Sequence, residues 1–319
     1  MKLSVIVPVY NEEESLPHLY PSIQQTMDSM QLDWEIIFVD DGSTDGSLAL
    51  LKDLCKKDRR HVRVVVFRRN YGQTAAIAAG IAQAKGDIVV LLDADLQNDP
   101  ADIPIMLSKL DEGYDVVSGW RKKRQDTFMT RIIPSRFANS LISWVTGVHL
   151  HDFGCTLKIY RREALSGFQL YGEMHRFIPV YAHSAGAKIA EVVVRHHPRK
   201  YGKSNYGIRR TFKVLLDLLT VKFLLGFSTN PIYIFGGAGI GLIFISMLAL
   251  LFLAVRRIFF SISVLNSPFF QISVMLIVLG FQSILMGLIA ELLMRTYHET
   301  LGKSPFSIRE LINCRPDRS

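Results

Sequence analysis

The sequence has few cysteines, and its first two thirds lack any long uncharged apolar run. Three cysteines occur in 319 residues, and no two of them have C-x-x-C spacing. An odd number without this spacing argues against a zinc site and against a disulfide framework. Free thiols are typical of the cytosol. Because they lack a long uncharged apolar run, the first 230 residues have the composition of an ordinary globular domain.

Charged residues are almost absent from two stretches near the C-terminus. Residues 231–255 contain no charge, and residues 269–294 contain only Glu291. Each stretch is long enough to cross a bilayer as a helix. From these shifts in composition we expect four parts: a globular domain over 1–206, an interfacial amphipathic helix over 207–229, two transmembrane helices within 230–295 and a C-terminal tail over 296–319.

The formal net charge of +8 indicates an anionic partner. Phosphorylated substrates, acidic lipids and nucleic acid all fit such a charge. The densest basic run, RHHPRKYGK at 195–203, is not accompanied by a recognised nucleic-acid-binding module. The two apolar stretches favour lipid, so we expect a membrane partner and no nucleic acid.

Apolar, β-branched runs alternate with helical patterns in the first hundred residues. They predict strands at 3–9, 34–39, 62–67 and 87–92. Between these strands they predict a helix over 13–30, a helix that ends near residue 57 and a helix over 74–84. This alternation predicts an α/β domain with a Rossmann-like, mostly parallel sheet.

A polar cluster follows each of the four predicted strands. The clusters are Tyr10–Glu12, Asp40–Ser43, Arg68–Gln73 and Asp93–Gln97. Any one of them could be a simple turn. However, the carboxyl ends of parallel strands meet at one edge of a sheet, where such sheets bind ligands. The coincidence of four clusters therefore favours a binding site.

Asp93 and Asp95 stand two residues apart directly after the fourth predicted strand, and Gln97 follows them. Two carboxylates and an amide oxygen are hard ligands that suit Mg²⁺ or Mn²⁺, and such an ion suits a diphosphate. A solvated turn is the alternative for this short pattern alone.

Several motifs together resemble a known family. VPVYNE at 7–12, DDGS at 40–43 and DAD at 93–95 resemble the GT-A fold of the inverting nucleotide-sugar glycosyltransferases of family 2. RRNYGQ at 68–73, DADLQNDP at 93–100 and DFGC at 152–155 resemble its polyprenyl-phosphate branch, which includes dolichol-phosphate mannose synthase and bacterial relatives. The chain has no Glu-Asp dipeptide and no Q-x-x-R-W motif, which argues against a processive polysaccharide synthase.

This resemblance implies roles for individual residues. The nucleotide sugar is expected at Pro8, Tyr10, Glu12, Asp40, Gln73 and Asp93, and a Mg²⁺ or Mn²⁺ cofactor at Asp93, Asp95 and Gln97. The phosphate of the acceptor is expected at Arg121, Arg131, Ser135, Arg176 and Lys203. Among these, Asp93, Asp95, Arg121 and Arg131 are the expected catalytic residues.

The expected activity is a metal-dependent, inverting transfer of a sugar from a nucleotide-diphosphate sugar, with UDP-glucose as the first choice, to undecaprenyl phosphate. A phosphate acceptor is already anionic at neutral pH, so the reaction barely requires a general base. Two alternatives remain open. One is a processive or other-acceptor membrane glycosyltransferase, and the other is a non-catalytic glycolipid carrier subunit.

Basic residues flank the membrane segments mainly on one side. They precede the first segment and follow the second, whereas only Arg256 and Arg257 lie between the two. This bias predicts a multi-pass protein with its catalytic domain and both termini in the cytoplasm. The resemblance implies that the membrane is a bacterial inner membrane. Small residues at Gly237-x-x-x-Gly241 and Ser283-x-x-x-Gly287 suit close helix contacts within one chain or between chains, and an ordinary gap-filling role is the alternative. A homo-oligomer is also expected.

Overall fold

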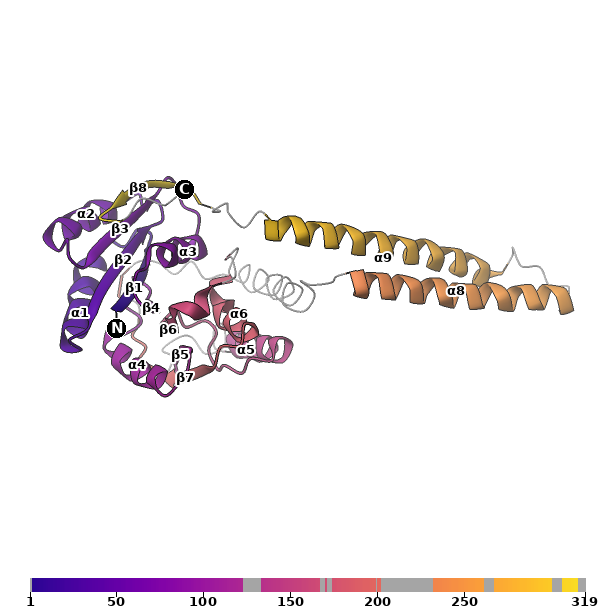
Figure 1. Ribbon diagram of the computed structural model, residues 1–319, viewed down its shortest axis with the longest axis horizontal. Coiled ribbons are helices and arrows are strands. Elements are labelled where there is room, and N and C mark those ends of the chain that lie inside the picture. Colours follow the sequence, from indigo (N-terminus) through magenta and orange to yellow (C-terminus); the bar gives the residue numbers. More distant parts are fainter. Residues whose placement is uncertain are drawn as a thin grey trace. The chain divides into compact units, whose positions relative to one another are not determined.

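The structure is a computed structural model (Figure 1). It describes residues 2–122, 133–166, 170, 174–198, 200–201, 232–260, 267–299 and 306–314. The chain divides into two compact units, one comprising Met1–Lys222 together with Ser304–Ser319, and the other Phe223–Lys303.

The strands of the described residues form one eight-stranded mixed sheet in the order β7-β5-β6-β4-β1-β2-β3-β8. Their bounds are β1 Lys2–Val9, β2 Asp33–Asp40, β3 Val62–Phe67, β4 Ile88–Leu91, β5 Val116–Trp120, β6 Lys158–Arg161, β7 Ile189–Val193 and β8 Ile308–Ile312. Strand β1 pairs in parallel with β2 and β4, and β2 pairs in parallel with β3. The parallel sheet predicted for the first hundred residues is therefore present.

Beyond β4 the sheet becomes mixed. Strand β6 runs antiparallel to both β4 and β5, and β5 pairs in parallel with β7. Because β6 lies next to β4 in the opposite direction, the loop that precedes β6 meets the loop that follows β4. This arrangement brings residues near 152–158 to the edge that carries Asp93.

Helices connect the strands of this unit. Their bounds are α1 Leu16–Ser29, α2 Ser47–Lys57, α3 Gln73–Gln83, α4 Ile103–Asp111, α5 Ile133–Thr146 and α6 Ile178–Ser184, with short 3-10 turns η1 Pro100–Asp102, η3 Arg162–Leu165 and η4 Met174–Phe177. Helix α1 begins three residues later than predicted because the carbonyl of Glu12 accepts hydrogen bonds from the backbone N–H groups of Ser15 and Leu16, which makes a separate turn.

The central strands are apolar at nearly every position because both faces of the sheet are covered. Val5, Ile6, Ile36, Ile37 and Phe38 are all fully buried. The run of buried side chains stops where the strands end, and the polar clusters follow there. The hydrophobic core thus determines where the strands end, and the polar clusters lie at that edge of the sheet.

Within the described residues, two helices are long and apolar enough to cross a membrane. They are α8 (Ile232–Phe260) and α9 (Pro268–Glu299), and their apolar spans are Phe235–Phe259 and Pro268–Ala290. These bounds agree with the expected stretches 231–255 and 269–294. The interfacial helix expected over 207–229 lies outside the described residues.

The two long helices approach most closely at a pair of glycines that sequence analysis did not select. A Cβ atom on Gly239 would lie 2.5 Å from the carbonyl oxygen of Gly280, so only glycine fits there. By contrast, a Cβ atom on Gly237 or Gly241 would have no heavy atom within 4 Å. The predicted Gly237–Gly241 face is therefore not the contact between α8 and α9. Ser283 does face α8, because its hydroxyl donates to the carbonyl of Phe235 at 2.7 Å.

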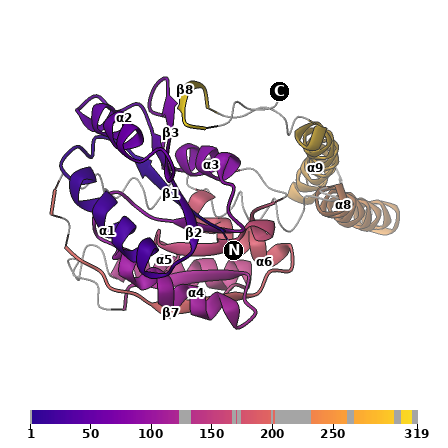
Figure 2. The same cartoon turned by 60° about the vertical axis from the view of Figure 1, so that its left-hand side comes forward.

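The C-terminal segment differs from the expected separate tail over 296–319. Helix α9 continues to Glu299, and β8 then pairs antiparallel with β3 at the edge of the sheet. Both views show β8 beside β3 (Figures 1 and 2). The C-terminal segment therefore belongs to the same compact unit as the N-terminal domain. Sequence analysis missed this strand because it is short and far along the chain from its partner.

Candidate functional site

The polar clusters after β1, β2 and β3 are tied together by hydrogen bonds. The side-chain oxygen of Asn11 accepts from the backbone N–H of Thr44 at 2.8 Å. Asp41 accepts from the backbone N–H groups of Tyr71 at 2.6 Å and Gly72 at 2.9 Å. These bonds hold three loops at one edge of the sheet, as the strand pattern predicted.

Gly42 makes this close packing of loops possible. Its φ is +71°, and a Cβ atom there would lie 2.5 Å from the backbone carbon of Arg69. Glycine tolerates this left-handed conformation without steric cost. The DDGS motif therefore has a local structural reason: Asp41 binds the loop after β3, and Gly42 lets that loop approach.

The residues expected to hold the nucleoside lie along this edge. Pro8 is the penultimate residue of β1 and is half-buried, whereas Tyr10 is exposed just past the end of β1. Glu12 accepts the hydroxyl of Ser15 at 2.6 Å. Asp40 ends β2 and is buried, and this burial raises the pKa of its carboxyl group. The four residues thus share the edge, with Tyr10 the most accessible.

Asp93 accepts hydrogen bonds on both carboxylate oxygens. Gln73 donates its side-chain N–H to Oδ1 at 2.6 Å, and the Thr156 hydroxyl donates to Oδ2 at 2.6 Å. These donors come from the start of α3 and from the loop before β6, so three chain segments converge on Asp93. Gln73 was expected near the donor, whereas Thr156 was not selected from the sequence.

Asp95 lies in a tight turn beyond Asp93. It is buried and accepts the backbone N–H of Gln97 at 3.2 Å, and Leu96 between them has a φ of +60°. Burial and the neighbouring charge of Asp95 raise the pKa of Asp93 to about 6. Asp93 is therefore a buried carboxylate that also lies beside a second negative charge.

This pair of carboxylates fits a divalent cation. The described residues contain no group of three or more His, Cys, Asp or Glu side chains that could hold a metal on its own. Mg²⁺ typically binds through one or two carboxylates and completes its shell with water and substrate phosphates, so a two-carboxylate site is sufficient. Gln97 is adjacent, and its backbone shapes the turn through the bonds to Asp95 and to the N–H of His197.

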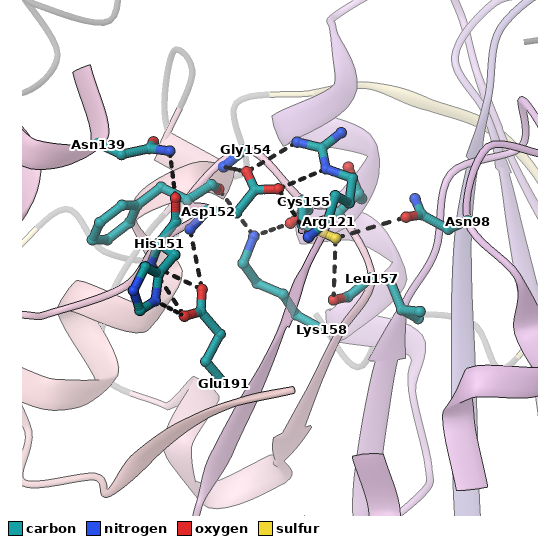
Figure 3. A network of polar contacts seen from close by, with 12 residues as sticks. Asn98, Arg121, Asn139, His151, Asp152, Gly154, Cys155, Leu157, Lys158 and Glu191 are labelled. Atoms are coloured by element: carbon teal, nitrogen blue, oxygen red, sulfur yellow. Dashed lines mark hydrogen bonds and ion pairs between the residues drawn. The ribbon is translucent and has the colours of Figure 1, made fainter. Parts of the chain in front are cut away.

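Arg121 follows β5 and forms a bidentate ion pair with Asp152. Its Nε donates to Oδ2 at 2.7 Å, and its Nη2 donates to Oδ1 at 3.0 Å (Figure 3). Both side chains are largely buried. Asp152 therefore fixes the orientation of the Arg121 guanidinium group.

A second guanidinium group lies beside this ion pair. A Cβ atom on Gly154 would be 3.3 Å from Nη2 of Arg121 and 3.6 Å from Nη1 of Arg176. Both arginines thus converge on the backbone of Gly154, two residues before the threonine that contacts Asp93. This places positive charge next to the carboxylate pair.

Lys158 is a buried residue of the site that sequence analysis did not select. It opens β6 and donates from Nζ to the backbone carbonyls of Phe153, at 3.1 Å, and Cys155 (Figure 3). Burial lowers the pKa of this lysine to about 8. Lys158 therefore fixes the loop that presents Asp152 and Thr156. Its role depends on contacts with backbone atoms, for which sequence spacing gives no signal.

His175 does not serve as an accessible base in this arrangement. It is buried, and its Nδ1 is hydrogen-bonded to the hydroxyl of Thr74 at 2.7 Å. Thr74 is the residue after Gln73 in α3. The histidine thus supports the start of the helix that carries Gln73.

The basic run 195–203 begins by contacting the segment after β4. Arg195 pairs with Asp99 at 3.0 Å and with Asp102 at 2.8 Å. Lys203 and Arg131, both expected at the acceptor phosphate, lie outside the described residues. Ser135 is on α5, but its side chain is also outside them.

Comparison with known proteins now defines the family. A model described as glycosyl transferase family 2 matches residues 4–168, which extend from within β1 to the end of β6 and include the polar clusters after β1 to β4. This chain belongs to glycosyl transferase family 2. The predicted family is confirmed.

The chain is also similar to curated members of this family over nearly its full length. It is 41% identical to a dodecaprenyl-phosphate galacturonate synthase from Rhizobium johnstonii, over 98% of this chain and 94% of that protein. It is 35% identical to an undecaprenyl-phosphate 4-deoxy-4-formamido-L-arabinose transferase from Proteus mirabilis, over 98% and 95%. The predicted resemblance to the polyprenyl-phosphate branch of family 2 is therefore confirmed.

Solved structures show the fold. A glucosyl-3-phosphoglycerate synthase from Mycobacterium tuberculosis, in complex with Mn²⁺, uridine diphosphate and phosphoglyceric acid, superposes with a TM-score of 0.53. The two chains are 22% identical, and the match covers 69% of this chain and 78% of the synthase chain. The predicted GT-A-like architecture, a mostly parallel sheet with flanking helices, is confirmed.

Proposed function

We propose that this glycosyltransferase transfers a sugar from a nucleotide-diphosphate sugar to a polyprenyl phosphate. The observation that carries this proposal is full-length similarity to two proteins named for different sugars but for the same class of acceptor. The acceptor class is the shared property, so it extends more readily to this chain than either sugar does.

The donor end of the site supports the same reaction. The edge formed after β1 to β4 offers buried Asp40 beside exposed Tyr10 for a nucleoside, and Asp93 with Asp95 for a diphosphate held by a cation. Asp93, Asp95 and Gln97 are the residues that would hold Mg²⁺ or Mn²⁺. When bound, the cation would supply positive charge to the leaving diphosphate.

The acceptor end lies beside it. A phosphate acceptor is repelled by the donor diphosphate, and arginines relieve such repulsion because their planar forks bind phosphate oxygens. Arg121 and Arg176 converge on Gly154 next to the carboxylate pair. Arg131, Ser135 and Lys203 complete the proposed acceptor set. Because Asp152 already holds one edge of the Arg121 fork, Arg121 enters the reaction pre-oriented.

In the proposed reaction a phosphate oxygen of the acceptor attacks the anomeric carbon from the face opposite the nucleotide. The new bond joins that oxygen to the sugar, the bond from the sugar to the β-phosphate oxygen breaks, and nucleoside diphosphate leaves. No proton transfer is required, which agrees with the burial of His175. Asp93 and Asp95 would hold the cation, and the arginines bind the attacking phosphate.

The sugar is the finer part of the proposal. UDP-glucose was the expectation from sequence, but the two relatives are named for galacturonate and for 4-deoxy-4-formamido-L-arabinose. We therefore place the nucleotide derivatives of these two sugars ahead of UDP-glucose. The site is proposed to act at the cytoplasmic face of a bacterial inner membrane, in a chain anchored by α8 and α9.

The test is a transfer assay with purified full-length protein and undecaprenyl phosphate. Radiolabelled UDP-linked galacturonate, 4-deoxy-4-formamido-L-arabinose and glucose are supplied separately, each with Mg²⁺, with Mn²⁺ or with chelator. The expected result is one acid-labile glycolipid from one donor, lost with chelator. Donor binding without glycolipid from any of the three would contradict the proposed reaction. Transfer that persists in chelator would contradict the proposed cofactor.

A further inference from the structure

The strand that follows the second membrane helix reaches the donor edge of the sheet. Strand β8 pairs antiparallel with β3, and β3 pairs in parallel with β2, which ends in Asp40. Asp40 is aligned with Val66 on β3, and Val66 is aligned with Glu310 on β8. A residue near Glu310 is therefore level with Asp40, two strands away, or about 10 Å at ordinary strand spacing.

The pairing of β8 with β3 contains an irregularity at this level. Phe67 is aligned with Ile308, whereas its neighbour Val66 is aligned with Glu310. Arg309 is thus an extra residue on β8 that has no aligned partner on β3, as in a β-bulge. Bulges turn a side chain away from the regular alternation and are frequent next to active sites.

The residues on either side of Arg309 are held by contacts within the domain. Arg309 itself is exposed and is the cation of β8. Glu310 forms an ion pair with Lys52 of α2 at 2.7 Å. On the other side, the ring of Phe306 stacks on Phe67 with centroids 5.0 Å apart, and Ser307 accepts the backbone N–H of Arg68 at 3.1 Å. The C-terminal segment thus holds both β3 and the first residue of the loop that leads to Gln73.

The positive charge of Arg309 interacts electrostatically with Asp40 at the donor edge. Burial raises the pKa of Asp40, and the positive charge of Arg309 acts in the opposite direction. The exposed guanidinium therefore lies close enough to the nucleoside end of the site to interact with Asp40. Arginine can stack on a base or donate hydrogen bonds to ribose oxygens, which suits this end of a nucleotide.

We propose that Arg309 is a donor-binding residue that contacts the nucleoside part of the nucleotide sugar. This inference rests on the proposed function, because it assumes that the edge near Asp40 holds a nucleoside. The donor site is then built from both ends of the chain. It is complete only when the segment after α9 has returned to the sheet.

The test compares Arg309→Gln with Glu310→Gln in full-length protein. Both variants remove one charge from the same exposed strand, but Glu310 faces Lys52 on α2. Binding of UDP, GDP and CDP is measured by titration calorimetry with Mn²⁺ present. For the nucleotide that the unchanged protein binds, Arg309→Gln should weaken affinity about tenfold, the size expected for a charge-assisted hydrogen bond. Glu310→Gln should change it less than about twofold.

Kinetics separate a binding role from a structural one. Arg309→Gln should raise the KM of the nucleotide sugar by a similar factor and leave the KM of the polyprenyl phosphate unchanged. Arg309→Lys should recover part of the loss because it keeps the charge, and it also tests the inference if the glutamine variant does not fold. Equal affinity of Arg309→Gln and the unchanged protein would overturn this inference alone. Absence of binding of all three nucleotides to the unchanged protein would overturn the proposed function as well.

Discussion

Thr156 donates a 2.6 Å hydrogen bond to the Asp93 carboxylate oxygen opposite the one that Gln73 binds. This bond favours the ionised carboxylate and so lowers the pKa of Asp93, against the effects of burial and of Asp95, which raise it to about 6. The ionised form is the one that binds a cation. Thr156 therefore helps to keep the Asp93 carboxylate ionised at neutral pH.

This balance predicts the acid limb of the pH–rate profile. As pH falls through about 6, Asp93 takes up a proton, and kcat/KM for the donor should fall at limiting metal. Thr156→Val removes a bond that lowers the pKa, so the midpoint should move to higher pH. Raising the metal concentration should move it to lower pH, because the cation competes with the proton. An unchanged midpoint in Thr156→Val would show that Asp93 does not control this limb.

Asp95→Asn should nearly abolish transfer. The substitution keeps the shape of the turn around Leu96 but removes one of the two charges available to a cation, and we expect a loss of about 100-fold or more in kcat. The melting temperature should stay close to that of the unchanged protein. Asp53→Asn is the matched control, because it removes an exposed carboxylate that pairs with Lys57 on α2. Near-normal turnover of Asp95→Asn would contradict the metal role.

The pair formed by Arg121 and Asp152 predicts an asymmetric effect on stability. Arg121→Ala removes the bidentate partner of the buried Asp152 carboxylate, and breaking a buried ion pair from one side typically costs about 3–5 kcal/mol. Asp152→Asn keeps the shape and leaves Arg121 in place, so the melting temperature should fall less. The KM for polyprenyl phosphate should rise in Asp152→Asn, because Arg121 is no longer oriented. If Asp152→Asn changes neither quantity, the ion pair has no part in placing the acceptor.

The N-terminal half of the fold could be predicted because its signals are local. The strands over 3–9 and 62–67 are apolar except at Ser4 and Arg63. The polar clusters after them indicate a site because the ends of parallel strands meet at one edge of the sheet. Asp93 and Asp95 could be selected for the same reason. Their chemistry is carried by their own side chains and by their place at the end of a strand.

The remaining parts depend on contacts between distant segments. Thr156 acts through Asp93, which becomes its neighbour only because β6 runs antiparallel to β4. Lys158 has partners nearby in the sequence, but they are backbone carbonyls, for which residue spacing gives no signal. Strand β8 is five residues long and lies more than 240 residues after β3 in the sequence, so no local pattern predicts their pairing. Gly239 was missed because a G-x-x-x-G pattern at 237 and 241 matched a familiar spacing, whereas the helix contact uses Gly280 on the other helix.

The glycine contact predicts how α8 and α9 respond to added volume. Gly239→Ala would place a methyl group 2.5 Å from the Gly280 carbonyl, so the helices must separate, at a cost of about 1–3 kcal/mol. Gly241→Ala is the control because its Cβ has open space. Melting in detergent should show a lower transition for Gly239→Ala and little change for Gly241→Ala. Equal melting of the two variants would mean that the helices do not meet at Gly239.

The pairing of β8 with β3 also predicts the topology of the membrane segment. Because Met1–Lys222 and Ser304–Ser319 belong to one sheet-containing unit, we expect these two parts of the chain to lie on the same side of a membrane. The excess of basic residues on this side indicates the cytoplasm. The short connection between the helices must then lie on the opposite side.

Reporter insertions test this arrangement directly. A phosphatase that is active only outside the cytoplasm should be inactive when fused at either end of the chain and active when inserted at residues 261–266. A fluorescent reporter that matures only in the cytoplasm should give the reverse pattern. The fusion at the N-terminus is the reference, since the catalytic domain must meet cytoplasmic nucleotide sugars. If the two termini report opposite sides, then β8 cannot pair with β3 of the same chain, and the proposed role of Arg309 fails with it.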